Sequence, residues 1–243
     1  PDSSSAEQGG GPSPWRSAAA QVLVDDLAAP ELDGDSAHHL GRVLRLRAGD
    51  EVCATDGRGG RRRCNIDGRA GLEPDGEVER TEALEYPVTV GFALVKGAKP
   101  ELVVQKLTEL GVDRIVVFAA ARSVVRWDGE RSTKQFDRLA RVARAACAQC
   151  RRLWLPEVAP GSLTELVAEG AVVADAGGRA MRRSDRTVLV GPEGGWTTDE
   201  LRGSDGAPVA TVGMAEHVLR AETAAITAGV LLTTLRAGLV AEA

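Results

Sequence analysis

The residues best suited to chemistry form a glycine-rich segment near the C-terminal end of the chain, at 191–196, with the sequence GPEGGW. This segment directly follows an apolar, β-branched run and precedes a helix-capping pattern. In α/β proteins a turn of this kind after a parallel strand is a common ligand site. Glycine lets the backbone come close to a ligand and present its N–H groups. The same pattern also suits a tight turn that binds nothing.

A second segment of this kind lies at 213–224, with the sequence GMAEHVLRAETA. It again follows an apolar run and leads into a helix, so we expect the two loops to face each other and enclose one ligand. Arg220 and Glu222 stand where the helix begins, within reach of a polar site. They also suit a plain surface pair in which the helix dipole favours Glu222. Neither loop carries a P-loop or a dinucleotide fingerprint.

The elements that must position these loops follow a regular alternation. From residue 87 onward, apolar runs typical of buried strands alternate with helical patterns, which predicts a largely parallel α/β sheet covered by helices. We expect strands at 88–95, 114–118, 171–174, 187–190 and 208–212, and helices at 100–110, 134–150, from 162, from 197 and at 221–236.

The N-terminal third has a different character. Residues 1–20 are rich in Ser, Gly, Pro and Ala without periodicity, which predicts a disordered tail. Residues 21–82 read as short strands and turns, with a hairpin signal at 56–60 and a short helix at 36–44. This pattern predicts a small β-barrel. The acidic stretch at 73–85 is expected to supply its last strand and the link onward.

Charge is distributed unevenly along the chain. The net charge of −5 argues at first against a nucleic-acid partner. Basic residues nevertheless outnumber acidic ones in the two segments 36–72 and 122–152. Local field rather than net charge steers a polyanion, so these segments are candidate RNA-binding surfaces. Taken alone, the charge pattern suits solvated surface faces equally well.

Composition excludes several classes of protein. The chain is 43% hydrophobic and 27% charged, enough to bury a core. No apolar run approaches the ~20 residues of a membrane span. Four cysteines are too few for a disulfide scaffold, which predicts a reducing cytoplasm. Cys147 and Cys150 form a Cys-x-x-Cys pattern inside a helix, but Cys53 and Cys64 are spaced too differently to complete a familiar zinc site. We therefore expect no metal.

Several ordered motifs together resemble the ribosomal RNA small subunit methyltransferase E family, which belongs to the SPOUT class. The most specific pair is GPEGG at 191–195 with LRAETA at 219–224. The remaining motifs of the resemblance are HHLGRVLR at 38–45, VKG at 95–97, QKLTELGV at 105–112, and AACAQCRR at 145–152 with Pro156. The chain departs from the family pattern at Ala148, Arg151, Ala215 and His217.

The resemblance implies an α/β fold: a SPOUT-type knotted parallel-sheet methyltransferase domain preceded by a small PUA-like β-barrel domain. The expected organisation is a tail at 1–20, a PUA-like RNA-binding barrel at 21–85 and a methyltransferase domain at 86–243. The implied activity is methylation of N3 of a uridine in 16S ribosomal RNA, with S-adenosylmethionine (SAM) as the methyl donor. The implied partners are 16S rRNA or the small ribosomal subunit and a second copy of the chain.

The resemblance and the loop patterns together nominate three groups of residues. The expected catalytic residues are Arg220 and Glu222. The expected RNA-binding residues are His39, Arg42, Arg45, Arg144 and Arg152. The expected cofactor-binding residues are Leu94, Gly191, Pro192, Glu193, Gly194, Gly195, Met214, Val218, Leu219 and Arg220.

Other functions stay open on the residues alone. One is a SPOUT enzyme that methylates another RNA base. A second is a non-catalytic RNA-binding protein whose glycine loops are only turns. A third is a nucleotide-dependent oxidoreductase, which the missing dinucleotide fingerprint disfavours.

Overall fold

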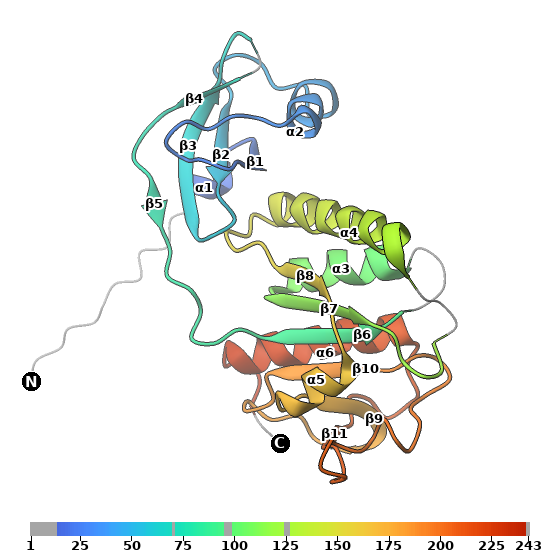
Figure 1. Cartoon of the computed structure of the whole chain (residues 1–243). Coiled ribbons are helices and arrows are strands. Elements are labelled where there is room, and N and C mark those ends of the chain that lie inside the picture. The colour runs from blue at the N-terminus through green and yellow to red at the C-terminus, as the bar shows by residue number, and fades with distance from the viewer. Residues whose placement is uncertain (1–13, 70, 95–98, 124–126, 242–243) are drawn as a thin grey trace, which may run out of the picture. The chain divides into compact units, whose positions relative to one another are not determined.

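The computed structural model describes residues 14–69, 71–94, 99–123 and 127–241. The chain forms two compact units: the first ends at Glu82 and the second begins at Ala83 (Figure 1). The sequence predicts this boundary after residue 85. The motif at 95–97 lies outside the described residues.

The N-terminal unit is built around one five-stranded sheet. Strand β3 lies at its centre and pairs antiparallel with β2, β4 and β5, while β1 pairs parallel with β2. Apolar side chains from β1, β2 and β3 form its core together with Leu40. The elements are α1 (Pro14–Ser17), β1 (Ala20–Leu23), α2 (Gly34–His38), the π-helix η1 (His39–Val43), β2 (Glu51–Thr55), β3 (Gly60–Ile66), β4 (Leu72–Pro74) and β5 (Glu79–Arg80).

The prediction that residues 1–20 form a disordered tail requires a correction for residues 14–20. Residues 1–13 lie outside the described residues. Helix α1 and the first residue of β1 fall inside the predicted tail. The backbone N–H of Ala19 donates to the carbonyl of Glu51 at 2.8 Å, and Ala18 is buried. The guanidinium of Arg61 lies 4.3 Å from the ring centroid of Trp15. These contacts order a segment whose composition alone favours disorder.

The C-terminal unit contains the predicted parallel sheet, with all of its strand pairs parallel. The strand order is β11-β9-β10-β6-β7-β8, so β10 lies between two strands that precede it in the sequence. The elements are β6 (Thr89–Ala93), α3 (Lys99–Leu110), β7 (Arg114–Phe118), α4 (Gly129–Gln149), β8 (Glu157–Pro160), α5 (Leu163–Ala168), β9 (Val172–Arg179), β10 (Thr187–Val190), β11 (Thr211–Val212) and α6 (Ala221–Arg236).

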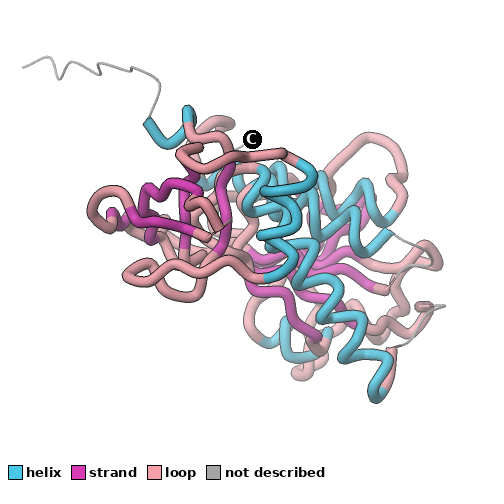
Figure 2. The backbone as a smooth tube through the Cα atoms, turned by 90° about the horizontal axis from the view of Figure 1, so that it is seen from above, coloured by secondary structure: helices cyan, strands magenta, loops and turns pink. Residues whose placement is uncertain are grey.

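Alternating side chains of the sheet form two separate cores. Helices α3, α4 and α6 cover one face, where Val90, Phe92 and Val188 are buried. Helix α5 and the segment 196–209 cover the other face, where Val116 and Leu189 are buried. Figure 2 shows helices lying together beside the strands. Among the described residues, no helix is long and apolar enough to cross a membrane, and no cluster of side chains is suited to hold a metal ion.

The pairing of strand β9 with β11 is irregular. Thr211 is paired with Val173, whereas the next residue, Val212, is paired with Arg179. The residues between Val173 and Arg179 therefore bulge away from β11. The two chain segments then cross closely, because a Cβ atom on Gly178 would collide with the backbone of Val212. A Cβ atom on Gly213 would lie 2.8 Å from the carbonyl oxygen of Gly178.

Candidate ligand site

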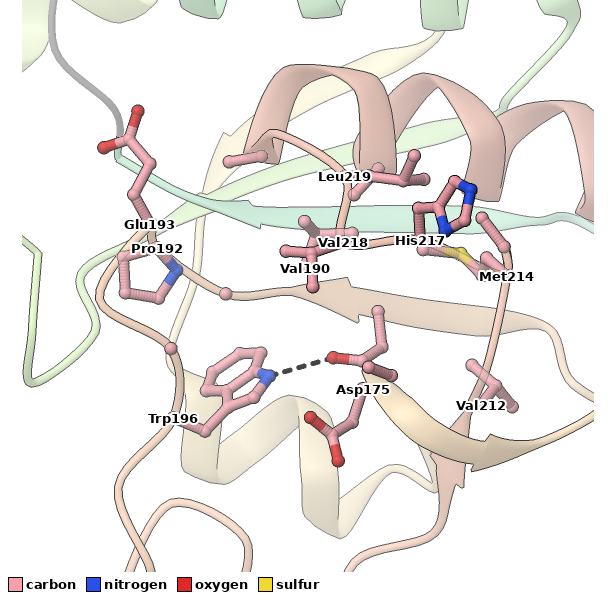
Figure 3. Close-up of a pocket in the computed structure, with 17 residues that line it drawn as sticks. Asp175, Val190, Pro192, Glu193, Trp196, Val212, Met214, His217, Val218 and Leu219 are labelled. Carbon is pink, nitrogen blue, oxygen red and sulfur yellow. Dashed lines mark hydrogen bonds between the residues drawn. The ribbon is translucent and has the colours of Figure 1, made fainter.

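A cavity lies where the bulge of β9 meets the loops that follow β10 and β11 (Figure 3). Its volume is about 290 Å³, near the lower end of the roughly 300–1,000 Å³ of small-molecule sites. The site forms at the C-terminal ends of parallel strands, as expected for an α/β sheet. The lining residues are Ala174, Asp175, Ala176, Val190, Gly191, Pro192, Glu193, Gly195, Trp196, Val212, Met214, Ala215, His217, Val218, Leu219, Ala221 and Ala224.

The first wall is the glycine loop at 191–196, and its glycines are required by close packing. A Cβ atom on Gly191 would lie 2.8 Å from the ring of Trp196, so no larger residue fits there without displacing the indole. Gly195 has a φ of +69°, which L side chains rarely adopt. The indole N–H of Trp196 donates to the carbonyl of Ala174 at 3.0 Å. The indole also stacks on Phe118, with ring centroids 6.1 Å apart.

Polar contacts with the neighbouring segment at 121–122 also hold this wall. A guanidinium N–H of Arg122 donates to the carbonyl of Gly194 at 2.9 Å. The carboxylate of Glu200 accepts hydrogen bonds from the backbone N–H groups of Ala121 at 2.7 Å and Thr197 at 2.8 Å. Burial by itself would raise the pKa of Glu200, but these hydrogen bonds and the nearby Arg122 outweigh it and hold the pKa below its ordinary value.

The helix predicted from residue 197 is absent. The capping pattern at 197–200 does form, with the Thr197 hydroxyl donating to Glu200 at 2.9 Å. The segment nevertheless makes only turns. The chain turns back after this cap, where the N–H of Gly203 donates to the carbonyl of Ala207 at 2.8 Å.

The second wall is the loop at 213–220, which makes fewer polar contacts with the described residues of the chain. Its backbone is tied to β9 where the N–H of Gly213 donates to the carbonyl of Arg179 at 2.9 Å. Val218 lines the cavity yet is 90% exposed. His217 also lines the cavity and is exposed. Helix α6 begins directly after this loop, and its residues Ala221 and Ala224 complete the wall.

The structure gathers most of the predicted cofactor residues around this cavity. Leu94 is buried at the end of β6, and Gly194 faces Arg122 rather than the cavity. Arg220 is the exposed N-cap residue of α6, so it lies next to the cavity without lining it. The predicted residues that do line it are Gly191, Pro192, Glu193, Gly195, Met214, Val218 and Leu219.

Two lining residues that are not among the expected cofactor-binding residues are Asp175 and Trp196. Asp175 belongs to the bulge of β9, and a register shift of that kind has no sequence signal. Trp196 is the last residue of the glycine-rich segment, and its place in that segment was the available signal.

Arg220 and Glu222 flank Ala221, which lines the cavity. Arg220 has an extended backbone, and its carbonyl accepts the Ala224 N–H at 2.8 Å, as an N-cap residue should. Glu222 is in the first turn of α6, is partly buried and already interacts with another group of the chain. Both residues therefore lie at the rim of the cavity.

The predicted RNA-binding residues fall into two groups. His39, Arg42 and Arg45 are exposed on and just after η1. Arg144 is partly buried in α4 and already has an interaction partner in the chain.

Arg152 requires a correction, because it occupies a largely buried ion cluster rather than an open surface. One guanidinium N–H donates to Asp113 at 2.8 Å and another to the Val112 carbonyl at 2.6 Å. Arg236 also pairs with Asp113 and donates to the Gly111 carbonyl at 2.9 Å. This cluster joins the ends of α3, α4 and α6. Removing one partner of a buried pair costs about 3–5 kcal/mol, so Arg152 is a structural residue.

The arginines of β3 are also occupied by contacts within the N-terminal unit. Arg61 pairs with Glu79 at 2.9 Å, and Arg63 lies 3.4 Å from Asp75. Arg62 donates to the carbonyls of Leu27 at 2.9 Å and Gly76 at 2.9 Å. These contacts leave the exposed helical segment with His39, Arg42 and Arg45 as the better candidate for a polyanion.

The four cysteines are free thiols, and their environments do not favour chemistry. Burial raises the pKa of Cys147 to about 12 and also raises the pKa of Cys150 and Cys64. A raised pKa keeps the thiol protonated and unreactive at neutral pH. Cys147 is buried among the residues of α4, and Cys150 is half-buried at its C-terminal end.

Comparisons with known proteins agree with this architecture. The family described as "RNA methyltransferase domain" matches residues 82–233, and the family described as "RNA methyltransferase PUA domain" matches residues 32–69. Ribosomal RNA small subunit methyltransferase E of Mycobacterium bovis is 34% identical over 229 residues, covering 85% of this chain and 87% of that protein. The protein of the same name from Bacillus subtilis is 27% identical, covering 83% and 88%.

Solved structures show the same fold. A Legionella pneumophila protein that was solved in complex with the bound cofactor SAM superposes with a TM-score of 0.78 at 26% identity. The match covers 88% of this chain and 96% of that protein. The predicted fold is confirmed: the parallel-sheet unit is of the SPOUT type, and a PUA-like domain precedes it.

Proposed function

The chain belongs to the RNA methyltransferase family, and from this premise we propose that it transfers a methyl group from SAM to N3 of a uridine in 16S ribosomal RNA of the small subunit. The observation that carries the proposal is the cavity between the loops 191–196 and 213–220. The names of the relatives and the SAM-bound Legionella protein support the substrate and the cofactor.

The residues of the cavity fit SAM as a ligand. The crowding at Gly191 and the positive φ of Gly195 favour glycine at both positions. The bare backbone, without side chains, therefore forms this part of the cavity wall. Such a wall suits the polar edge of an adenosine, which backbone groups recognise well. Apolar side chains from Val190, Met214 and Leu219 suit its flat faces. Glu193 and Asp175 supply negative charge for a donor with a net positive charge.

Bound SAM supplies a methyl carbon that is already activated by its sulfonium, so positioning is a large part of catalysis. The new N3–C bond forms as the S–C bond breaks, and the N3 proton must leave. Arg220 stabilises the negative charge that develops on the uracil oxygens. It cannot act as the base, because its guanidinium keeps its proton. Glu222 either accepts the N3 proton or orients Arg220.

Substitution of Arg220 tests the catalytic proposal. We expect Arg220→Ala to lower kcat by about 100-fold or more, as for the loss of one charge-stabilising donor, with SAM affinity nearly unchanged. The measurement is single-turnover methylation of 16S rRNA together with a melting curve and mapping of the modified base. A folded variant that methylates at the wild-type rate would remove Arg220 from the mechanism. Glu222→Gln then separates its two roles, since only a proton acceptor changes the pH profile.

The exposed helical segment of the N-terminal unit is the proposed RNA-binding surface, with His39, Arg42 and Arg45 as its contacts. We expect Arg42→Gln with Arg45→Gln to weaken RNA binding. Each lost phosphate contact should reduce the slope of log affinity against log salt by about 0.7–0.9. Arg202→Gln is the matched control, because Arg202 is exposed and lies outside both basic segments. Equal slopes in the double variant and the control would assign these arginines to another role.

We also propose a homodimer that acts in the cytoplasm. Val218 at the cavity, and Leu239 and Val240 after α6, are exposed apolar residues that a second copy would cover. The free thiols suit a reducing compartment. Sedimentation equilibrium checks the dimer, and a single species at the mass of 25.5 kDa would contradict it. Calorimetry with NADH and ATP covers the rival nucleotide-dependent functions, and we expect no binding of either.

A further inference from the structure

Asp175 lines the cavity, but it is not among the residues that the sequence predicts to bind the cofactor. It lines the cavity from the bulge of β9. Within the described part of the chain, its carboxylate has no hydrogen-bond or ion-pair partner. Glu193, the other carboxylate of the lining, already interacts with another group of the chain. Asp175 is therefore an exposed acidic group of the cavity lining whose carboxylate is available to a ligand.

The structure holds Asp175 in place through its neighbour. The carbonyl of Ala174 accepts the indole N–H of Trp196 at 3.0 Å, which ties the bulge to the glycine loop (Figure 3). Trp196 is itself stacked on Phe118. On the other side of Asp175, the bulge crosses the start of the second loop at the close contact between Gly178 and Gly213. The carboxylate is thus presented by a backbone that is fixed on both sides.

A carboxylate at this position in the cavity can distinguish ligands by charge. SAM carries a sulfonium, an ammonium and a carboxylate, with a net charge of about +1 at neutral pH. Its demethylated product, S-adenosylhomocysteine, has a neutral thioether and no net charge. The two molecules share every other group, so a negative charge near the sulfur favours the donor over the product.

We propose that Asp175 is a specificity residue whose carboxylate faces the sulfonium and favours the methyl donor over the demethylated product. This inference rests on the proposed function, because it requires SAM in this cavity. Transfer of the methyl group removes the positive charge next to Asp175, and the product loses an attraction that the donor has. The same group that helps to bind the donor therefore helps to release the product.

Calorimetric titration of the full chain with SAM and with S-adenosylhomocysteine tests the inference. We expect Asp175→Asn to weaken SAM binding by about fivefold or more, and product binding by less than about twofold. The donor-to-product affinity ratio of the wild type should fall with added NaCl, whereas that of Asp175→Asn should not. Asp175→Glu keeps the charge and should keep most of the ratio. Asp199→Asn is the matched control, since Asp199 is exposed and outside the cavity lining.

Each alternative result has a distinct meaning. An equal loss for both ligands would overturn the inference, because it would place Asp175 at a hydroxyl or an ammonium that the two share. Unchanged affinities for both would also overturn it. A wild-type chain that binds neither ligand would overturn the proposed function and the inference together. Melting curves separate a misfolded variant from all of these.

Discussion

The two loops that form the cavity differ in how firmly the rest of the fold holds them. The loop at 191–196 is fixed by the indole of Trp196, by Arg122 and by Glu200. The loop at 213–220 is anchored at Gly213, and its Val218 is 90% exposed. Within the part of the chain that the structure describes, one wall is preorganised for a ligand, while few contacts hold the other before a ligand or a partner arrives. Groups that are already ordered bind a ligand without losing conformational entropy. The looser wall must lose that entropy when a ligand binds.

The strongest test of this comparison removes the packing of the fixed wall. Gly191→Ala places a Cβ atom 2.8 Å from the Trp196 ring. The overpacking should displace the indole and lower the melting temperature. Because the displaced wall is no longer preorganised, we expect SAM affinity to fall by on the order of 30-fold, equivalent to about 2 kcal/mol. Calorimetry measures it. Gly177→Ala is the control, because nothing lies within 4 Å of its Cβ position. A wild-type affinity in Gly191→Ala would show that this wall is not preorganised.

A milder test loosens the fixed wall from behind. Glu200→Gln weakens the acceptor of the Ala121 and Thr197 N–H groups. We expect a melting temperature lower by roughly 2–4 °C at neutral pH and a few-fold weaker SAM binding. The lowered pKa of Glu200 means that its stabilisation is present above its ordinary value of 4.5 and is lost as the pH falls through the folded-state pKa. The difference from wild type should therefore vanish in acid, and a difference that persists there would contradict this assignment.

The smallest effect is expected in the looser wall. Val218→Ser changes an exposed side chain, so the melting temperature should not move and SAM affinity should fall by about two- to threefold. Hydrogen exchange sharpens the comparison. In the free protein the amides of 214–219 should exchange faster than those of 191–196, and SAM should protect them more. Equal protection of both loops without a ligand would remove the distinction.

Sequence patterns were sufficient for the parts of the fold that depend on burial. The strands at the centre of a parallel sheet are continuous apolar runs, such as Thr187–Val190, and the pattern identifies them. Strand β8 was missed because Glu157–Pro160 is a partly exposed edge strand with no apolar run. The predicted helix at 197 does not continue beyond its cap, because the chain turns back between Gly203 and Ala207.

The site was predictable where glycine spacing marks it and not where tertiary contacts decide. Glycines at 191–195 located one wall of the cavity. Asp175 was missed because its position depends on the register shift between Thr211 and Val212. Arg152 was assigned to RNA from its charge, but its partner Asp113 is in a separate element. Charge can be counted in a sequence, whereas the pairing of that charge cannot.

The position of β10 between β9 and β6 has a consequence for the order in which this protein is made. Strand β6 obtains its partner β7 early, but its other edge stays open until residues 187–190 are synthesised. Every residue of the cavity lies between 174 and 224. Pairings this distant in sequence form slowly, and an open strand edge is a risk for aggregation. A nascent chain that ends before α6 therefore contains every strand of the sheet but lacks Ala221 and Ala224 of the cavity lining. A ligand that binds the complete cavity stabilises the finished fold alone.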